Sequence, residues 1–288
     1  MNDIKLKEHK MTNQIYPCLW FDGQANAAAE FYCSIFNNSK ITSENQVVVT
    51  FELNGTKFMG LNGGPMFEIN PSISFFVICG SINETNRMWD RLIDGGKALM
   101  PIDEYPWSER YGWLQDKFGV TWQLSVSSNE DTNLKISPSI LFTNDLFGSA
   151  ERAVNYYSAV FDNSSIDVMI HYPPEDANAG KVMFSEFKLN GYNIIAMDGP
   201  GDHDFYFNEA VSFVVECDTQ DEIDEYWELL TDGGEESMCG WLKDKFGVSW
   251  QIIPAILPKL MIDPEKAPGV IKALMSMKKL DINLLKNA

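Results

Sequence analysis

The spacing of apolar residues changes repeatedly along the chain, and each change predicts a new secondary-structure element. Residues 15–21 form a short apolar run that is typical of a strand, whereas residues 23–37 carry apolar side chains at helical spacing. Two further strand-like segments flank the dipeptide Asn54-Gly55, which strongly favours a two-residue hairpin turn. This part of the chain therefore predicts a strand, a helix and a hairpin.

The same succession follows in the next part of the chain. Residues 71–79 predict a strand, and residues 81–96 predict a helix that Ser81 and Glu84 cap at its start and Gly-Gly ends. Two more strands follow, the last of them at residues 120–126. The pattern thus indicates two successive β-α-β-β-β modules.

This whole arrangement occurs twice, because the chain contains a tandem repeat. The phrases at residues 112–124 and 240–252 agree at ten of thirteen positions, and other matched phrases follow in the same order in both halves. We expect an N-terminal tail at residues 1–13, a first domain at 14–127, a linker at 128–135, a second domain at 136–253 and a tail of two or three amphipathic helices at 254–288. Asp281 is expected to cap the last helix.

The two halves differ in two loops. The second half has about eleven extra residues near residues 171–181, and it lacks about ten residues that the first half has at 101–110. The first-half segment contains Trp107 between prolines and tyrosines. It is interpreted either as a lid or wall of a pocket, or as a surface loop that packs on the other half.

Composition and charge restrict the classes of partner. Hydrophobic residues make up 45% of the 288 residues, which is ample for a buried core. The formal net charge of −19 disfavours nucleic acids and anionic membranes, and no run of eighteen apolar residues predicts a membrane span. The polar N-terminus and the odd number of cysteines, 5, without a CxxC pair, indicate a cytoplasmic protein with reduced thiols.

Several phrases resemble one family. The chain contains YPCLWFDGQANAAAEFYCSIF, LNGGP, DGGK and YGWLQDKFGVTWQL. These runs resemble the PhnB-like branch of the vicinal oxygen chelate superfamily, which includes glyoxalases, bleomycin-resistance proteins and extradiol dioxygenases. Many sequences of this branch carry the label 3-demethylubiquinone-9 3-methyltransferase-like. The resemblance implies an α+β fold of tandem glyoxalase-like domains, built of paired βαβββ modules that form a cupped sheet, with C-terminal helices added.

Enzymes of this superfamily usually hold a divalent metal in the cup with His, Gln or Glu side chains on the first and last strands of each module. The matching positions here fall near Tyr16, Ser72, Ser137 and Ala210 on first strands, and near residues 60–62 and 196–198, Gln123 and Gln251 on last strands. Of these, only Asp198 has a carboxylate, and the three histidines, His9, His171 and His203, match none of them. We therefore predict no metal and no cofactor.

The candidate ligand-binding residues lie in the strands and loops expected to surround the cup. They are Tyr16, Cys18, Trp20, Asn62, Trp107, Gln123, Ser139, Asp198 and Gln251. If successive side chains of the last strands point to opposite faces of the sheet, Gln123 and Gln251 face the cup, where each either orients a ligand or bridges strand ends. Trp122 and Trp250 then point the other way, into a helix-packed core. No catalytic residue is assigned.

Three functions remain open. The first is metal-free binding of an unknown small molecule, the second is a metal-dependent enzyme with an atypical site, and the third is a structural scaffold. Methyl transfer is judged unlikely, since the glycine-rich turns do not follow a strand and open a helix. We expect the two halves to pair within one chain. Dimerisation of the whole chain is left open.

Overall fold

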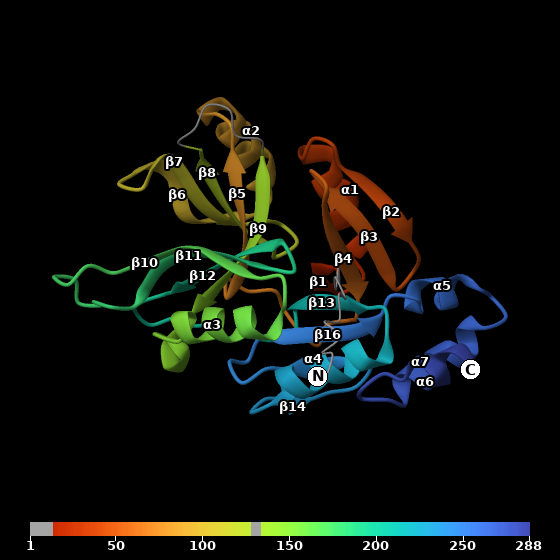
Figure 1. The fold of residues 1–288 in the computed structure, drawn as a ribbon. Helices are drawn as coiled ribbons and strands as arrows, with labels where there is room; N and C mark the ends of the chain where they lie inside the picture. Colours follow the sequence, from red (N-terminus) through yellow and green to blue (C-terminus); the bar gives the residue numbers. More distant parts are fainter. Residues whose placement is uncertain (1–13, 128–133) are drawn as a thin grey trace, which may run out of the picture.

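The computed structural model describes residues 14–127 and 134–288, so the expected N-terminal tail and most of the expected linker lie outside the described residues. The described chain forms four modules and a helical tail (Figure 1). Module 1 comprises β1 (Ile15–Phe21), α1 (Ala25–Ile35), β2 (Lys40–Glu44), β3 (Val48–Leu53) and β4 (Thr56–Asn62). Module 2 comprises β5 (Ile73–Cys79), α2 (Ile82–Leu92), β6 (Lys97–Tyr105), β7 (Ser108–Gln115) and β8 (Thr121–Val126).

The second half repeats this order. Module 3 comprises β9 (Lys135–Phe142), the short helix η1 (Asn144–Leu146), α3 (Ala150–Val160), β10 (Ser165–His171), β11 (Val182–Leu189) and β12 (Tyr192–Asp198). Module 4 comprises β13 (Val211–Cys217), α4 (Gln220–Thr231), β14 (Glu235–Glu236), β15 (Trp241–Lys243) and β16 (Ser249–Pro254). The tail contains α5 (Leu257–Ile262), α6 (Ala267–Met275) and α7 (Ile282–Lys286). The α+β class with C-terminal helices is confirmed.

Each sheet takes one module from each half of the chain. Sheet A has the order β14-β15-β16-β13-β1-β4-β3-β2, and sheet B has the order β10-β11-β12-β9-β5-β8-β7-β6. The modules join where β1 pairs antiparallel with β13 and where β5 pairs antiparallel with β9. The two halves therefore interlock through two strand pairs, and each cupped sheet needs both halves.

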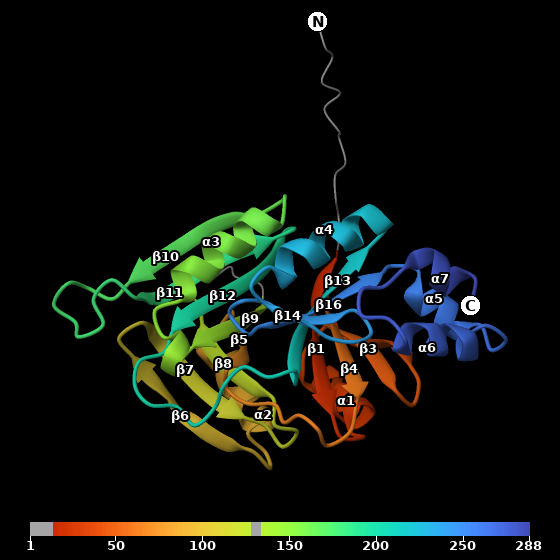
Figure 2. The same ribbon diagram turned by 90° about the horizontal axis from the view of Figure 1, so that it is seen from below.

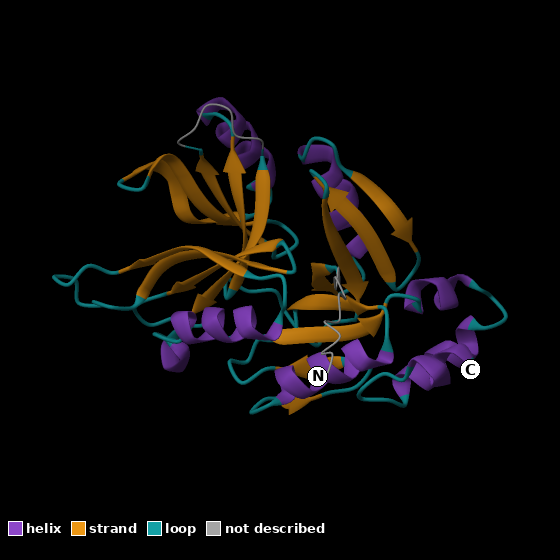
Figure 3. Cartoon of the chain, in the orientation of Figure 1, coloured by secondary structure: helices purple, strands orange, loops and turns teal. Residues whose placement is uncertain are grey.

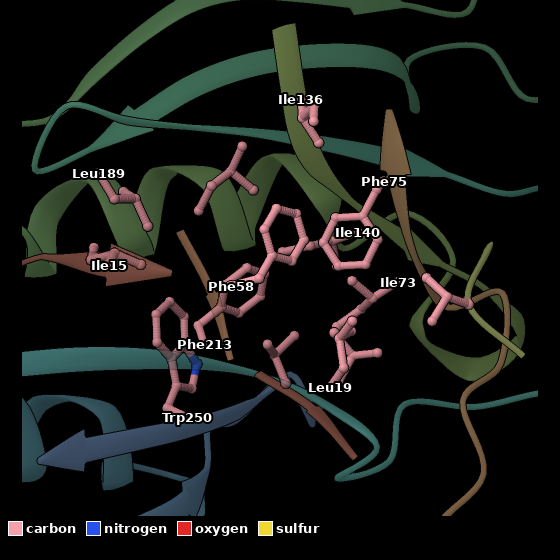
Figure 4. Close-up of a cluster of buried hydrophobic side chains, with 14 of the residues drawn as sticks. Ile15, Leu19, Phe58, Ile73, Phe75, Ile136, Ile140, Leu189, Phe213 and Trp250 are labelled. Carbon is pink, nitrogen blue, oxygen red and sulfur yellow. The ribbon is translucent and has the colours of Figure 1, made fainter. Parts of the chain in front are cut away.

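The hydrophobic core lies between the two sheets and the module helices. Figure 3 shows α1 with α2 on one side of the molecule and α3 with α4 on the other. The rings of Phe58 in sheet A and Phe75 in sheet B lie 5.1 Å apart, and the core continues to Phe213 and Trp250 (Figure 4). One continuous core thus holds the convex sides of both sheets together, and the concave sides are left facing outward.

Local signals in the sequence explain several boundaries. Asn54 and Gly55 adopt φ angles of 49° and 80°, as a two-residue hairpin between β3 and β4 requires. Ser81 Oγ accepts a hydrogen bond from the Glu84 backbone N–H, and the Glu84 carboxylate accepts one from Gly80 N–H, so the predicted cap at the start of α2 is present. Within the described residues no helix is long and apolar enough to cross a membrane.

The C-terminal tail packs beside the shortened hairpin of module 4. Backbone N–H groups of Cys239 and Gly240 donate to Met277 O and Lys278 O at 2.7 and 2.8 Å, where module 2 instead has its long β6–β7 hairpin. Asp281 caps α7 through Leu284 N–H at 2.8 Å, as expected. The tail helices lie together at one side of the molecule, next to β3 and β16 (Figure 2), and they cover part of the concave face of sheet A.

Candidate functional site

The predicted site residues separate into three places. We call the concave face of sheet A cup A and that of sheet B cup B. Tyr16, Cys18 and Trp20 alternate along β1 on the side of cup A, together with Gln251 of β16. Ser139 and Gln123 meet in cup B, and Trp107 lies at the tip of the β6–β7 hairpin of the same sheet. Asn62 and Asp198 lie at the ends of β4 and β12, next to helix starts.

The structure uses Asn62 and Asp198 differently from the expected ligand contact. Asn62 Oδ1 accepts a hydrogen bond from Ala25 N–H at the start of α1. Asp198 Oδ1 accepts hydrogen bonds from Gly148 and Ala150 N–H at the start of α3, and its Oδ2 accepts one from Val182 N–H. Both side chains therefore occupy equivalent positions in the two halves and act as helix caps.

Each copy of the repeated phrase, at residues 112–124 and 240–252, contains a buried aspartate that was not among the predicted site residues. Asp244 Oδ2 accepts hydrogen bonds from Trp250 Nε1 at 2.8 Å and Tyr157 OH at 2.7 Å, while Oδ1 accepts from the Phe246 and Val248 N–H groups. Asp116 has the same four kinds of donor in the first half, including Trp122 Nε1. The core packing expected for Trp122 and Trp250 is confirmed. The aspartate could have been found from the sequence, because it is identical in both copies of the phrase.

Burial raises the pKa of Asp116 and of Asp244, and the hydrogen bonds that each accepts oppose this shift. Each carboxylate ties a helix of its half to the last strand of the second module, since Tyr32 comes from α1 and Tyr157 from α3. The phrase is therefore a structural element of the fold, and it lies on the convex side of the sheets.

The floor of cup B is a closed hydrogen-bond network. Gln123 Nε2 donates to Ser74 Oγ at 2.7 Å and to Ser139 Oγ at 3.4 Å, while Tyr111 OH donates to Gln123 Oε1 at 2.7 Å. Phe76 packs against Tyr111 at 6.3 Å and against Phe184 on the opposite side at 6.1 Å. Side chains of the chain itself thus reach across cup B.

Trp107 continues the row of contacting aromatic rings from Phe76 and Tyr111 to the tip of the β6–β7 hairpin. Its ring stacks on Tyr105 at 5.0 Å and meets Tyr111 edge-on at 5.7 Å, and 62% of the residue is exposed. The segment is the turn of a long hairpin of sheet B. It therefore lies in a different cup from Tyr16 and Trp20.

The floor of cup A also has a glutamine and a serine, but a cysteine, Cys18, stands where cup B has Ser139. Gln251 Nε2 donates to Ser212 Oγ at 3.0 Å, and both side chains hydrogen-bond with the Cys18 thiol. Burial raises the pKa of Cys18 to about 12, against the effect of these two hydrogen bonds. The thiol is therefore protonated at neutral pH and is a poor nucleophile.

Above this floor lies a cavity of about 960 Å³, near the upper end of the range usual for small-molecule sites. β1, β3, β4 and the end of module 4 form its walls, and α5 and α6 form its roof. The apolar part of the lining includes Val48, Met59, Leu61, Ile253, Leu257, Met261 and Leu274. Four further lining side chains are large, apolar and exposed at the mouth: Val47, Met66, Met238 and Ile262.

One end of this cavity is polar. Tyr16 OH donates to Glu216 Oε1 at 2.7 Å, and Lys57 Nζ lies 2.8 Å from the same oxygen and 3.9 Å from the centre of the Tyr16 ring. Burial, and secondarily the Glu216 carboxylate, raises the pKa of Tyr16 above its ordinary value. The phenol therefore remains a hydrogen-bond donor at any physiological pH.

The other end is aromatic. The Trp20 ring lies 6.0 Å from Trp241 and 5.0 Å from Phe67, and its Nε1 donates to Gly64 O at 2.6 Å. A Cβ on Gly63 would lie only 2.2 Å from the Trp20 ring, so the glycine is required for this placement. Trp20 lies four residues after Tyr16, so the two ends are separated by about 13 Å along β1.

The residues at the cup floors do not suit a divalent metal. Cross-strand pairing brings Cys18 next to Met59 and Ser212, with Gln251 adjacent, and it brings Ser139 next to Ser74 and Ile195 in the other cup. Neither set contains a carboxylate or an imidazole, which are the usual ligands of such an ion. Among the described residues no group of three or more His, Cys, Asp or Glu side chains is arranged to hold a metal.

These floor positions lie two residues beyond those expected on the first strands. Cys18 and Ser139 contact the glutamines, whereas the metal-ligand positions matched to the family were Tyr16 and Ser137. Likewise Ser74 and Ser212, and not Ser72 and Ala210, receive the glutamine amides. The face was predicted correctly because side chains alternate, but the position along the strand depends on register between modules.

Comparison with known proteins agrees with this architecture. The family model described as 3-demethylubiquinone-9 3-methyltransferase matches residues 13–125 and again residues 134–253. The chain belongs to this family. No curated protein was found to match the chain.

Solved structures include relatives of one half and of the whole chain. A putative 3-demethylubiquinone-9 3-methyltransferase, PhnB protein, from Bacillus cereus is 34% identical over 39% of this chain and 98% of its own, with a TM-score of 0.37. Glyoxalase I from Zea mays is 9% identical over 88% of this chain and 98% of its own, with a TM-score of 0.55. A putative dioxygenase from Bacillus subtilis is 9% identical over 83% of this chain and 84% of its own, with a TM-score of 0.51. The fold is thus that of the vicinal oxygen chelate superfamily, in tandem form.

The cysteine environments predict a definite order of alkylation. All five cysteines are free, but Cys18, Cys79 and Cys217 are buried, and burial raises the pKa of Cys18 and Cys79 to about 12. We expect iodoacetamide near pH 8 to modify Cys33 and Cys239 first and to leave the three buried thiols unmodified in the folded protein. Peptide mass spectrometry measures this order, with urea-unfolded protein as the control. Labelling of Cys18 as fast as Cys239 would contradict the described floor of cup A.

Proposed function

We propose that the protein binds a small, largely apolar molecule in cup A. The observation that carries this proposal is the cavity of about 960 Å³, which combines an apolar wall with a few polar groups at one end. Exposed apolar side chains at the mouth, such as Met66 and Ile262, are unusual on a surface without a partner and favour an apolar occupant.

Binding is favoured over catalysis by the protonation states in the cavity. Cys18 and Tyr16 both have raised pKa values, so neither supplies an anionic nucleophile or base at neutral pH. The Glu216 carboxylate is already paired with Lys57 and Tyr16. The floor residues also offer no ligand set for the metal that the enzymes of this superfamily use, so we derive no metal-dependent step.

Cup B has a different role in this proposal. Its network of Gln123, Ser74 and Tyr111 is satisfied internally, and its aromatic rings contact one another across the cup. These contacts favour a structural role, in which cup B stabilises the interlocked halves. The scaffold function is thus retained for one cup, and ligand binding for the other.

Matched substitutions in the two cups test the proposal. Leu61 lines cup A and pairs with Trp20, and Met197 occupies the equivalent position beside Leu141 in sheet B. With the neutral dye Nile red as the probe, we expect Leu61→Trp to weaken binding at least about tenfold, because the indole fills the cavity, and Met197→Trp to leave binding unchanged. Fluorescence titration measures both affinities.

Thermal unfolding provides the control that each variant folds, and saturating dye should raise the melting temperature of the wild type. Loss of binding in Met197→Trp alone would assign the ligand to cup B. Unchanged binding in both variants, or no binding by the wild type, would overturn the proposal.

A further inference from the structure

We infer that the occupant of cup A is an organic cation, an apolar molecule with a positively charged group. This inference rests on the proposed function and adds the charge of the ligand. Seven charged side chains line the cavity, five of them carboxylates: Glu52, Glu209, Glu216, Glu235, Glu236, Lys57 and Lys243. The lining therefore carries an excess of three negative charges, two of which are offset by Lys40 and Lys278, lysines outside the lining that pair with Glu52 and Glu236. The remaining excess of one negative charge disfavours anions in an otherwise apolar cavity.

Each of the two lysines in the lining is already paired with a carboxylate of the protein. Lys57 Nζ lies 2.8 Å from Glu216 Oε1, with the Gln14 amide oxygen at 3.1 Å and the Tyr16 ring beneath it. Lys243 Nζ lies 2.8 Å from Glu209 Oε1. A ligand carboxylate or phosphate that bound either ammonium group would therefore lie beside the carboxylate of Glu216 or Glu209, and the two anions would repel each other.

The aromatic end of the cavity supplies the surface that a cation prefers. The Trp20 ring contacts both Phe67 and Trp241, and tryptophan faces attract cations most strongly. Glu235 pairs across β14 and β15 with Lys243, two residues beyond Trp241, and therefore lies at the same end. An ammonium or phosphonium group there meets indole faces and carboxylates together, while its apolar substituents meet the wall.

The two halves differ at the residue that creates this end. Trp20 of β1 corresponds in register to Leu141 of β9, because they pair with Leu61 and Met197 at equivalent places. A Cβ on Gly63 would collide with the Trp20 ring, whereas one on Gly199 would lie 3.0 Å from Leu141. Module 1 thus has a tryptophan in cup A where module 3 has a leucine in cup B.

A pair of ions of similar shape and opposite charge tests the inference. The probes are tetraphenylphosphonium and tetraphenylborate, measured by calorimetric titration against the full chain at low and moderate salt. We expect the phosphonium ion to bind at least about tenfold more tightly than the borate, with a preference that decreases as salt rises. Glu235→Gln should weaken phosphonium binding about two- to fivefold.

The net charge of the chain could by itself favour cations, so a matched control is needed. Glu104→Gln removes the same charge from the exposed β6–β7 hairpin of sheet B, close to Tyr105. It should leave phosphonium affinity unchanged. An equal loss in Glu104→Gln and Glu235→Gln would show that only net charge matters and would overturn the inference.

The remaining outcomes separate this inference from the proposed function. If Nile red binds in cup A but the borate binds as tightly as the phosphonium ion, the charge of the ligand is assigned wrongly and the cavity proposal stands. If Nile red and both ions fail to bind the folded wild type, the cavity proposal and the inference fail together.

Discussion

Replacing Asp116 or Asp244 by alanine is expected to lower the free energy of unfolding by about 3–5 kcal/mol. Each carboxylate is buried and accepts hydrogen bonds from an indole, a phenol and two backbone N–H groups. Alanine would leave these four donors without their acceptor inside the core, where water cannot readily replace it. Urea unfolding followed by circular dichroism measures the loss.

An exposed aspartate from another repeated phrase is the control. Asp94 belongs to the DGG phrase that both halves share, and its side chain faces solvent. Asp94→Ala should change the free energy of unfolding by less than about 0.5 kcal/mol. Similar stability of all three variants would mean that the repeated phrase does not hold the fold together in the described way.

Leu280→Ala is expected to cost about 2–4 kcal/mol and to loosen the C-terminal tail from cup A. Leu280 is fully buried in the cluster that joins the tail helices to Tyr16, Met59 and Ile253. Removing most of its side chain leaves a cavity at the point where Lys278 pairs with the module 4 backbone. Trypsin cleavage at residues 278–279 should therefore become faster, together with a lower melting temperature.

Leu284 offers the matched control, because it is 58% exposed four residues further along the chain. Leu284→Ala should change neither the cleavage rate nor the melting temperature appreciably. Faster cleavage in Leu284→Ala than in Leu280→Ala would mean that the tail docks through its other face.

Regular elements and the duplication could be predicted from the sequence because their signals are local. The strand at β1, the hairpin at Asn54-Gly55 and the cap at Ser81 follow from apolar spacing and turn chemistry. The β-α-β-β-β pattern implied a strand between α1 and β3, but no residues were assigned to it, since the sequence KITSE of β2 is polar and forms an exposed edge of sheet A. The amphipathic pattern of the tail did not show which apolar residues are covered: in α6 Val270 is buried, whereas Ile271 and Met275 are exposed.

The site could be predicted only in part. Tyr16, Cys18 and Trp20 were named as candidates, and in the structure all three lie on the face of β1 that belongs to cup A. Which glutamine they meet depends on the exchange of modules between halves, so Gln251 and not Gln123 faces them. The capping role of Asp198 also depends on tertiary contacts, since its partners lie up to 50 residues away in sequence.

A crystal soaked with 6-bromo-2-naphthol tests the central claim most directly. This neutral aromatic probe carries an anomalous scatterer, so its position is measured without reference to the surrounding side chains. We predict a bromine peak in cup A, between the β1 wall and the roof formed by α5 and α6. A peak in cup B, beside Gln123 and Phe76, would contradict the assignment of the ligand cavity to sheet A.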